Sequence, residues 1–156
     1  MGLFSFLTQE IAIDLGTANT VVIHNDKVVV DEPSIVAIDN NTGKLIAIGE
    51  TARQMHGKTH ESIKTIRPLR DGVIADFNAA ELMIRGMVKM INKGPRLFAP
   101  SLKMVVGIPS GSTEVEIRAV RDSSEHAGGR DIYMIYEPMA SAIGIGIDVE
   151  APEGSM

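Results

Sequence analysis

The segment from Ile11 to Thr20, which reads IAIDLGTANT, limits the possible folds of this chain more than any other segment. It begins with an apolar run typical of a buried strand, and the apolar pattern resumes at Val21 after a small polar turn. We therefore expect a hairpin whose turn contains Gly16, and successive backbone N–H groups in such a turn can bind an anion. Asp14 follows the first strand and could hold a metal ion beside that anion. An ordinary hairpin with a glycine turn has the same short pattern, so other segments must decide between the two interpretations.

The composition limits the class of protein. A chain of 156 residues with 44% hydrophobic content is long enough to bury one core, which indicates about one domain. A formal net charge of −5 argues against a general nucleic-acid binder, because such proteins need a basic face. The sequence has no cysteine, so it has no disulfide framework and no thiolate chemistry. We expect an acidic intracellular protein with no nucleic-acid partner.

Strands and helices alternate along the chain. Apolar stretches typical of strands occur at 27–31, 35–38, 45–48, 104–108 and 132–135. Helical spacing or capping signals occur at 50–56, at 78–91 with Asn78 as the N-cap, after the capping box Thr113–Glu116, and from Glu137 onward. This order predicts an α/β fold with a mixed sheet. Residues 33–67 have short strands and dense polar loops of their own, which predicts a small inserted subdomain.

Three packing details follow from the same pattern. The continuous apolar run at 104–108 predicts a buried parallel strand. Met83 and Met87 recur at helical spacing and are expected to fill the core. The helix after Pro138 is lined by small residues such as Ala140 and Gly144, which predicts close packing against a neighbour.

Two apolar segments are candidates for contact with a membrane. The first eight residues hold four large apolar side chains: Leu3, Phe4, Phe6 and Leu7. They are typical of a short amphipathic anchor or of an end that folds back on the protein. The loop at 92–103 carries Leu97 and Phe98 among basic residues. These two either insert among acidic lipid headgroups or pack under the neighbouring helix.

Two carboxylates at strand ends are the chemical candidates, Asp14 and Glu137. Groups beyond the carboxyl ends of strands in an α/β sheet converge on a ligand crevice. Asp14 would lie near a metal ion and phosphates, and Glu137 could orient a water that attacks a terminal phosphate or accept its proton. Glu137 also precedes a proline at a helix start, where a carboxylate can serve only as a favourable cap. The four histidines lie far apart in the sequence, so no histidine metal site is predicted.

Five motifs occur in a characteristic order: DLGTANT at 14–20, EPSIVAI at 32–38, RPLRDGVIADF at 67–77, VVGIPSG at 105–111 and YEPMASAIGIGI at 136–147. In this order and spacing the chain resembles the MreB family of bacterial actin-like, rod shape-determining proteins, from about residue 10 onward. The D-x-G-T motif is shared with actins, sugar kinases and heat-shock chaperone ATPases. The block at 67–77 and the short insertion are more specific to the MreB family.

The resemblance implies an actin-like ATPase (ribonuclease H-like) fold. Subdomain IA would comprise residues 1–32 and 68–156, with a membrane-binding N-terminus at 1–8, and subdomain IB would be the insertion at 33–67. The second large domain would be absent, so the fold would be incomplete. The residues implied to bind the ATP phosphates are Gly16, Thr17, Ala18, Asn19 and Thr20.

The resemblance also implies roles for the candidate residues. Asp14 would hold Mg²⁺, through water, and Glu137 would position the attacking water. Leu97 and Phe98 would belong to a membrane-insertion loop. Tyr136 stands where the family often has a second acidic residue, which changes the polarity beside Glu137.

The implied function is an ATP-dependent filament that organises cell-wall synthesis and rod shape. It would be cytoplasmic and peripheral at the inner face of the cell membrane. Its partners would be further copies of itself, inner-membrane lipid and cell-wall elongation proteins such as MreC, MreD and RodZ. Because the sequence stops before D-x-G-G-G-T, the second phosphate loop of the family, we expect weak or no ATP binding and no turnover by this chain alone. The alternatives are another ATPase of the superfamily, such as a chaperone or kinase, and a non-catalytic membrane- or partner-binding module.

Overall fold

The structure is a computed structural model, and it describes residues 8–58, 61–91, 101–152 and 154. The predicted membrane residues Leu3, Phe4, Phe6, Leu7, Leu97 and Phe98 lie outside the described residues. Within the described part, no helix is long and apolar enough to cross a membrane.

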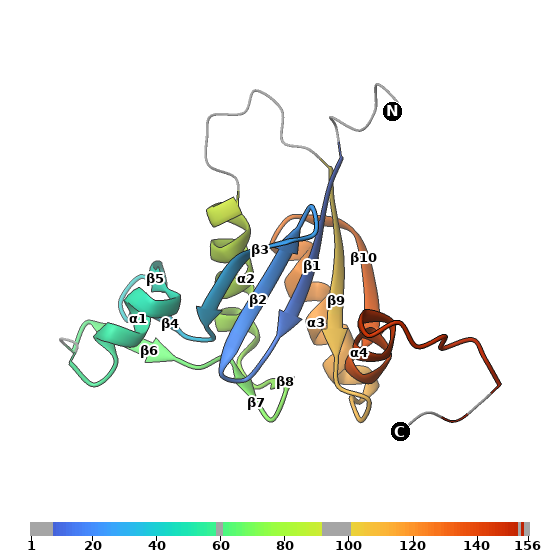
Figure 1. Cartoon of the computed structure of the whole chain (residues 1–156). Coiled ribbons are helices and arrows are strands. Elements are labelled where there is room, and N and C mark those ends of the chain that lie inside the picture. The colour runs from blue at the N-terminus through green and yellow to red at the C-terminus, as the bar shows by residue number, and fades with distance from the viewer. Residues whose placement is uncertain (1–7, 59–60, 92–100, 153, 155–156) are drawn as a thin grey trace.

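The main sheet has five strands in the order β10-β9-β1-β2-β3 (Figure 1). The strands are β1 (Thr8–Leu15), β2 (Asn19–His24), β3 (Lys27–Pro33), β9 (Ser101–Ile108) and β10 (Gly129–Tyr136). β1 pairs in parallel with β9, and β9 with β10, whereas β1, β2 and β3 form an antiparallel meander. The predicted mixed sheet is therefore confirmed.

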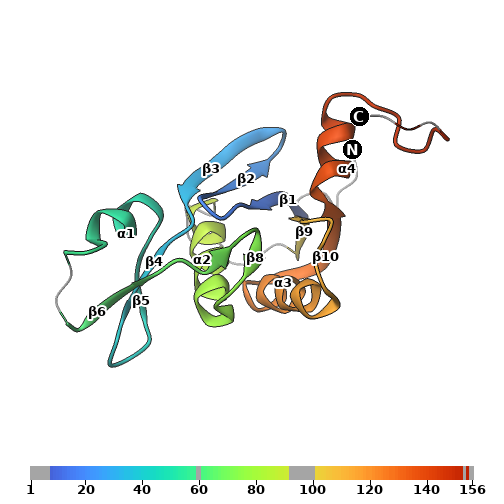
Figure 2. The same ribbon diagram turned by 90° about the horizontal axis from the view of Figure 1, so that it is seen from below.

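Two helices, α2 (Phe77–Ile91) and α3 (Glu114–His126), lie together on one face of this sheet (Figure 2). Alternate residues of β1 point toward them, and Ile11, Ile13 and Leu15 are buried there. Met83 and Met87 of α2 are buried in the same core, as predicted. Because strand side chains alternate between the two faces, this core lies on one side of the sheet only.

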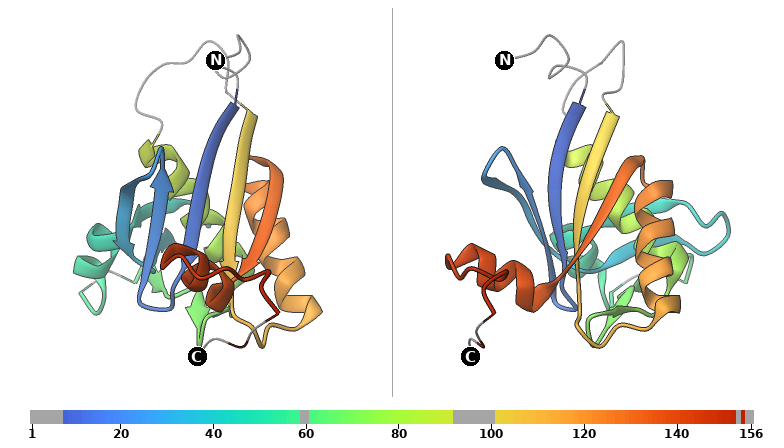
Figure 3. Two further views of the ribbon diagram at one scale, coloured as in Figure 1. Left: turned by 45° about the vertical axis from the view of Figure 1, so that its right-hand side comes forward. Right: turned by 90° about the vertical axis from the view of Figure 1, so that its right-hand side faces the viewer.

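The other face of the main sheet is open over much of its area. The remaining helix of this region, α4 (Glu137–Gly144), lies at one end of that face, opposite α2 and α3 (Figure 3). The predicted parallel strand at 104–108 is confirmed, and its Met104, Val106 and Ile108 are buried, but Val105 is 39% exposed because it points to the open face. No residue of α4 is buried, and nothing lies within 4 Å of a Cβ added to Gly144, so the predicted close packing is not seen at that residue.

Residues 36–66 form a second, three-stranded sheet in the order β5-β4-β6. Its elements are β4 (Val36–Asp39), β5 (Leu45–Ile48), α1 (Gly49–Met55) and β6 (Ile63–Ile66). One side of this sheet packs on α2 through residues such as Val36, and the other side packs on α1 around Ile35, Ala37 and Ala52. The sheet lies within the range predicted as the inserted subdomain. The short hairpin β7 (Leu69–Arg70) and β8 (Val73–Ile74) follows it.

The starts of two helices test the capping predictions. The capping box of α3 is confirmed, since the Thr113 side chain accepts the Glu116 N–H and the Glu116 side chain accepts the Thr113 N–H. The prediction that Asn78 caps α2 was wrong. The helix begins at Phe77, and Asp76 Oδ1 accepts the N–H of Ala79 at 3.0 Å. Both residue types are good N-caps, so composition alone could not choose between them.

Candidate functional site

Residues 16–20, called here the 16–20 turn, comprise the tight turn between β1 and β2 and the first two residues of β2. A Cβ added to Gly16 would collide with the carbonyl oxygen of Asn19, so only glycine fits there. Thr17, Ala18 and Asn19 are exposed, whereas Thr20 is fully buried. The exposed backbone of this turn can therefore reach a ligand, while its end is fixed in the core.

Side chains from other segments hold the turn in place. The Thr17 hydroxyl accepts the N–H of Gly72, in the β7–β8 hairpin, at 2.8 Å. The Asn19 side chain donates to Asp31 Oδ1 at 3.0 Å. Ser34, just after β3, also binds the turn, and it was not predicted from the sequence. The only sequence signal for it is its place in the EPSIVAI motif.

The structure brings the two candidate carboxylates to the same end of the main sheet. Asp14 lies in β1 and Glu137 follows β10, with β9 between them. Gly107 of β9 occupies the position between the two: an added Cβ would lie 3.6 Å from Glu137 Cγ and 3.9 Å from Asp14 Oδ1. A larger side chain at this position would fill the space beside both carboxylates.

Asp14 and Glu137 also share an electrostatic environment. Burial raises the pKa of the Glu137 carboxyl, and the charge of Asp14 raises it further. Both side chains line a pocket of about 460 Å³ between the open face of the sheet and α4. A carboxylate with a raised pKa is a better proton acceptor, so this environment suits Glu137 to accept a proton from a bound water.

The donor set near the turn is compatible with a phosphate-bound divalent cation. No group of three or more His, Cys, Asp or Glu side chains in the described part of the chain could enclose a metal ion. Mg²⁺ does not need such a group, since it usually keeps several waters and takes one or two carboxylates together with phosphate oxygens. Asp14, at the strand end that leads into the turn, could supply such a carboxylate. Position 136 is a tyrosine that is 45% exposed, so Asp14 is the acidic residue that acts on the pKa of Glu137.

The family model and the similar proteins all point to one protein family. Residues 8–156 match the family model described as MreB/Mbl protein. The cell shape-determining protein Mbl of Bacillus subtilis is 43% identical over 150 residues, which cover 95% of this chain and 44% of that protein. The cell shape-determining protein MreB of Haemophilus influenzae is 44% identical over 160 residues, which cover 99% of this chain and 44% of that protein. The chain thus spans less than half the length of these relatives.

Solved structures show the same fold. MreB5 of Spiroplasma citri bound to ADP superposes with a TM-score of 0.77 at 35% identity, covering 94% of this chain and 44% of that chain. The MamK double helical filament superposes with a TM-score of 0.73 at 20% identity, covering 88% of this chain and 43% of that chain, and supports the fold alone. The predicted actin-like fold is confirmed by these likenesses.

Proposed function

Because this chain belongs to the MreB/Mbl family, we propose that it forms the first phosphate-binding half of a nucleotide-dependent, cell shape-determining filament protein. The observation that carries the proposal is the tight glycine turn at 16–20 next to the carboxylates Asp14 and Glu137. The family match over residues 8–156 favours this function over the chaperone and kinase alternatives.

Nucleotide binding is supported by the relatives as well as by the geometry. MreB5 of Spiroplasma citri, 35–36% identical to this chain, has been solved bound to ADP and to AMPPNP. In this chain the N–H groups of residues 16–20 would donate to phosphate oxygens, as in other anion-binding turns. Asp14 would hold Mg²⁺, whose charge neutralises the phosphates. Glu137 would orient a water toward the terminal phosphate and accept its proton.

The wider function is proposed on the family and on the sequence. The two named relatives are cell shape-determining proteins and span more than twice the matched length. We therefore propose filament formation with further copies, attachment to the inner face of the cell membrane, and contact with elongation proteins such as MreC, MreD and RodZ. Leu3, Phe4, Phe6, Leu7, Leu97 and Phe98 are the proposed membrane residues.

The phosphate-binding proposal can be tested on the purified chain by NMR. Titration with MgADP and MgATP should shift the backbone amides of residues 16–20 first, because these N–H groups are the proposed phosphate donors. Substituting Asp14→Asn should weaken the Mg²⁺-dependent part of the shift. The exposed Asp26, in the β2–β3 turn, supplies the matched control Asp26→Asn. Amides at 16–20 that do not respond to either nucleotide would contradict phosphate binding by this chain.

A further inference from the structure

Ser34 has no exposed surface and makes three contacts with the 16–20 turn. Its Oγ lies 2.6 Å from the carbonyl oxygen of Gly16, and its N–H donates to the carbonyl oxygen of Ala18 at 2.8 Å. Its Oγ also lies 2.9 Å from Oγ1 of Thr20, which is fully buried too. One buried residue therefore holds the beginning, the middle and the end of the turn.

The directions of these hydrogen bonds can be assigned. A serine hydroxyl has one hydrogen, and a carbonyl oxygen can only accept. Ser34 must therefore donate to Gly16, so the Thr20 hydroxyl donates to Ser34. The relay from Thr20 through Ser34 to Gly16 uses both hydroxyl hydrogens, so neither group can rotate without losing a buried hydrogen bond.

These bonds fix which way the turn presents its N–H groups. In a planar trans peptide the N–H points away from the carbonyl oxygen of the preceding residue. Since the Gly16 and Ala18 carbonyls point to Ser34, the N–H groups of Thr17 and Asn19 point away from it. Both residues are exposed, so their N–H groups face the open side of the turn, where an anion can approach.

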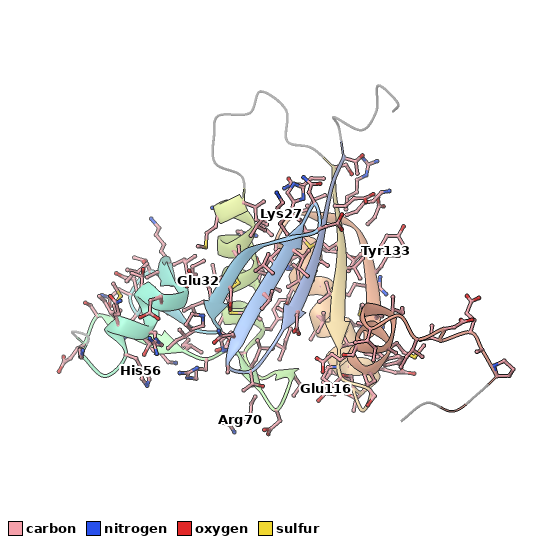
Figure 4. The ribbon with its side chains drawn as sticks, viewed as in Figure 1. Lys27, Glu32, His56, Arg70, Glu116 and Tyr133 are labelled. Atoms are coloured by element: carbon pink, nitrogen blue, oxygen red, sulfur yellow. The ribbon has the colours of Figure 1, made fainter. Side chains whose placement is uncertain are left out.

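Ser34 is itself held firmly. Two residues before it, Glu32 points from the end of β3 toward α1 (Figure 4), and its Oε2 accepts the Glu50 N–H at 2.7 Å. One residue after it, the carbonyl oxygen of Ile35 accepts the Gly49 N–H at 3.0 Å. The segment that carries Ser34 is thus hydrogen-bonded to the start of α1, which supports the turn.

We propose that Ser34 is a positioning residue for phosphate binding: it holds the Gly16 and Ala18 carbonyls away from the ligand so that the N–H groups of the turn stay directed at the anion. Ser34 touches no ligand in this role. The inference rests on the proposed function for the identity of the anion, but the ordering of the turn can be measured without any ligand.

The first experiment measures the order of the turn by ¹⁵N relaxation in the free chain. The order parameters of the Thr17 and Asn19 amides should fall from about 0.85 in the wild type to below about 0.6 in Ser34→Ala. The matched control is Ser124→Ala, which removes an equally buried hydroxyl whose Oγ donates to Val120 in α3 at 2.8 Å. The control should leave the turn as ordered as in the wild type, although both variants lose a buried hydrogen bond.

The second experiment measures the affinity of the chain for MgATP. Ser34→Ala should weaken MgATP binding by about tenfold or more, because a disordered turn no longer holds its N–H groups toward the charged phosphates. The control Ser124→Ala should bind MgATP like the wild type, which separates the role of Ser34 from a general loss of stability. If the wild type binds no nucleotide, the proposed function fails while the relaxation data still test Ser34.

The outcomes are distinct. A turn that stays as ordered in Ser34→Ala as in the wild type would overturn the inference, whether or not nucleotide binds. If Ser34→Ala does not fold, Ser34→Cys is measured instead, since a thiol is a weaker donor of similar shape. A partial loss of order at Thr17 and Asn19 in that variant supports the inference, and a wild-type value overturns it.

Discussion

Gly49, the first residue of α1, lies against Glu32 in a backbone conformation that favours glycine. Its φ is +61°, and an added Cβ would lie 2.8 Å from Glu32 Cδ and 2.9 Å from Glu32 Cβ. Glu32 cannot move aside freely, because its carboxylate accepts the Glu50 N–H at 2.7 Å. A side chain at position 49 would therefore break the contact that fixes the Ser34 segment to α1.

We expect Gly49→Ala to destabilise the protein more than Gly43→Ala does. Gly43 has a similar φ of +67° but nothing near its Cβ position, so its substitution should cost only the conformational strain, about 1–2 kcal/mol. Gly49→Ala should cost an additional 1–3 kcal/mol or so for overpacking. Urea unfolding of the two variants measures the difference. If both substitutions lowered the free energy of unfolding equally, the Glu32 side chain would be able to move away from position 49 at no cost in stability.

The raised pKa of Glu137 predicts how stability depends on pH. Burial and the charge of Asp14 raise this pKa above its usual value of 4.5. At a pH between the usual pKa and the raised pKa, the Glu137 carboxyl is protonated in the folded chain and ionised in the unfolded chain. The contribution of Glu137 to the free energy of unfolding is therefore fully present below about pH 4.5, and it is lost as pH rises through the raised pKa.

Glu137→Gln should remove this part of the pH dependence and raise the stability near neutral pH relative to the wild type. Thermal unfolding across this range of pH measures the effect. Asp14→Asn should reduce the same slope in part, because it removes one of its two causes. The exposed Glu150, for which substitution by Gln should change little, serves as the control. A slope unchanged in Glu137→Gln would contradict the pKa shift.

Among the elements, those set by local patterns were predictable and those set by distant contacts were not. The capping box Thr113–Glu116 is complete within four residues, so the sequence revealed it. The start of α2 was missed by two residues, because Asp76 and Asn78 offer the same chemistry. The exposure of Val105 depends on whether anything covers the second face of the sheet, which an apolar run does not tell.

In the candidate site too, the residues set by a local pattern were predictable, and those set by distant contacts were not. The D-x-G-T pattern pointed to Asp14 and the 16–20 turn, because a strand, an acidic residue and a glycine turn are adjacent in sequence. The contact of Ser34 with Gly16 joins residues 18 positions apart. That of Thr17 with Gly72 joins residues 55 positions apart. No spacing rule for local structure reaches so far, and only the fold reveals these contacts.

The apolar segment around Leu97 and Phe98 carries a prediction of its own. Burying one such side chain contributes about 1.5–3 kcal/mol, so the double substitution Leu97→Ser/Phe98→Ser should clearly reduce binding to vesicles that contain acidic lipid. Co-sedimentation measures the bound fraction. Val115, 79% exposed on α3, supplies the control Val115→Ser, which should bind like the wild type. Equal binding by all three proteins would contradict the role of this segment.

At the scale of the whole molecule, the described residues form two cores that meet at the strand β4. The larger core joins the main sheet to α2 and α3 and includes Val36. The smaller core, around Ile35, Ala37 and Ala52, lies between the second sheet and α1. Ile35 and Val36 are adjacent and both fully buried, yet each belongs to a different core. A small core with few buried side chains should open locally at a lower free energy than the large one.

Native-state hydrogen exchange of two neighbouring substitutions can test this division. Ile35→Ala should lower the opening free energy of the α1 amides by about 2 kcal/mol or more and leave β1 and β9 protected as in the wild type. Val36→Ala removes a side chain of the larger core, so it should also lower the protection of α2 and the main sheet. If both variants lowered protection uniformly, the two cores would unfold as one unit. In that case α1 and the Ser34 segment would be as stable as the main sheet itself.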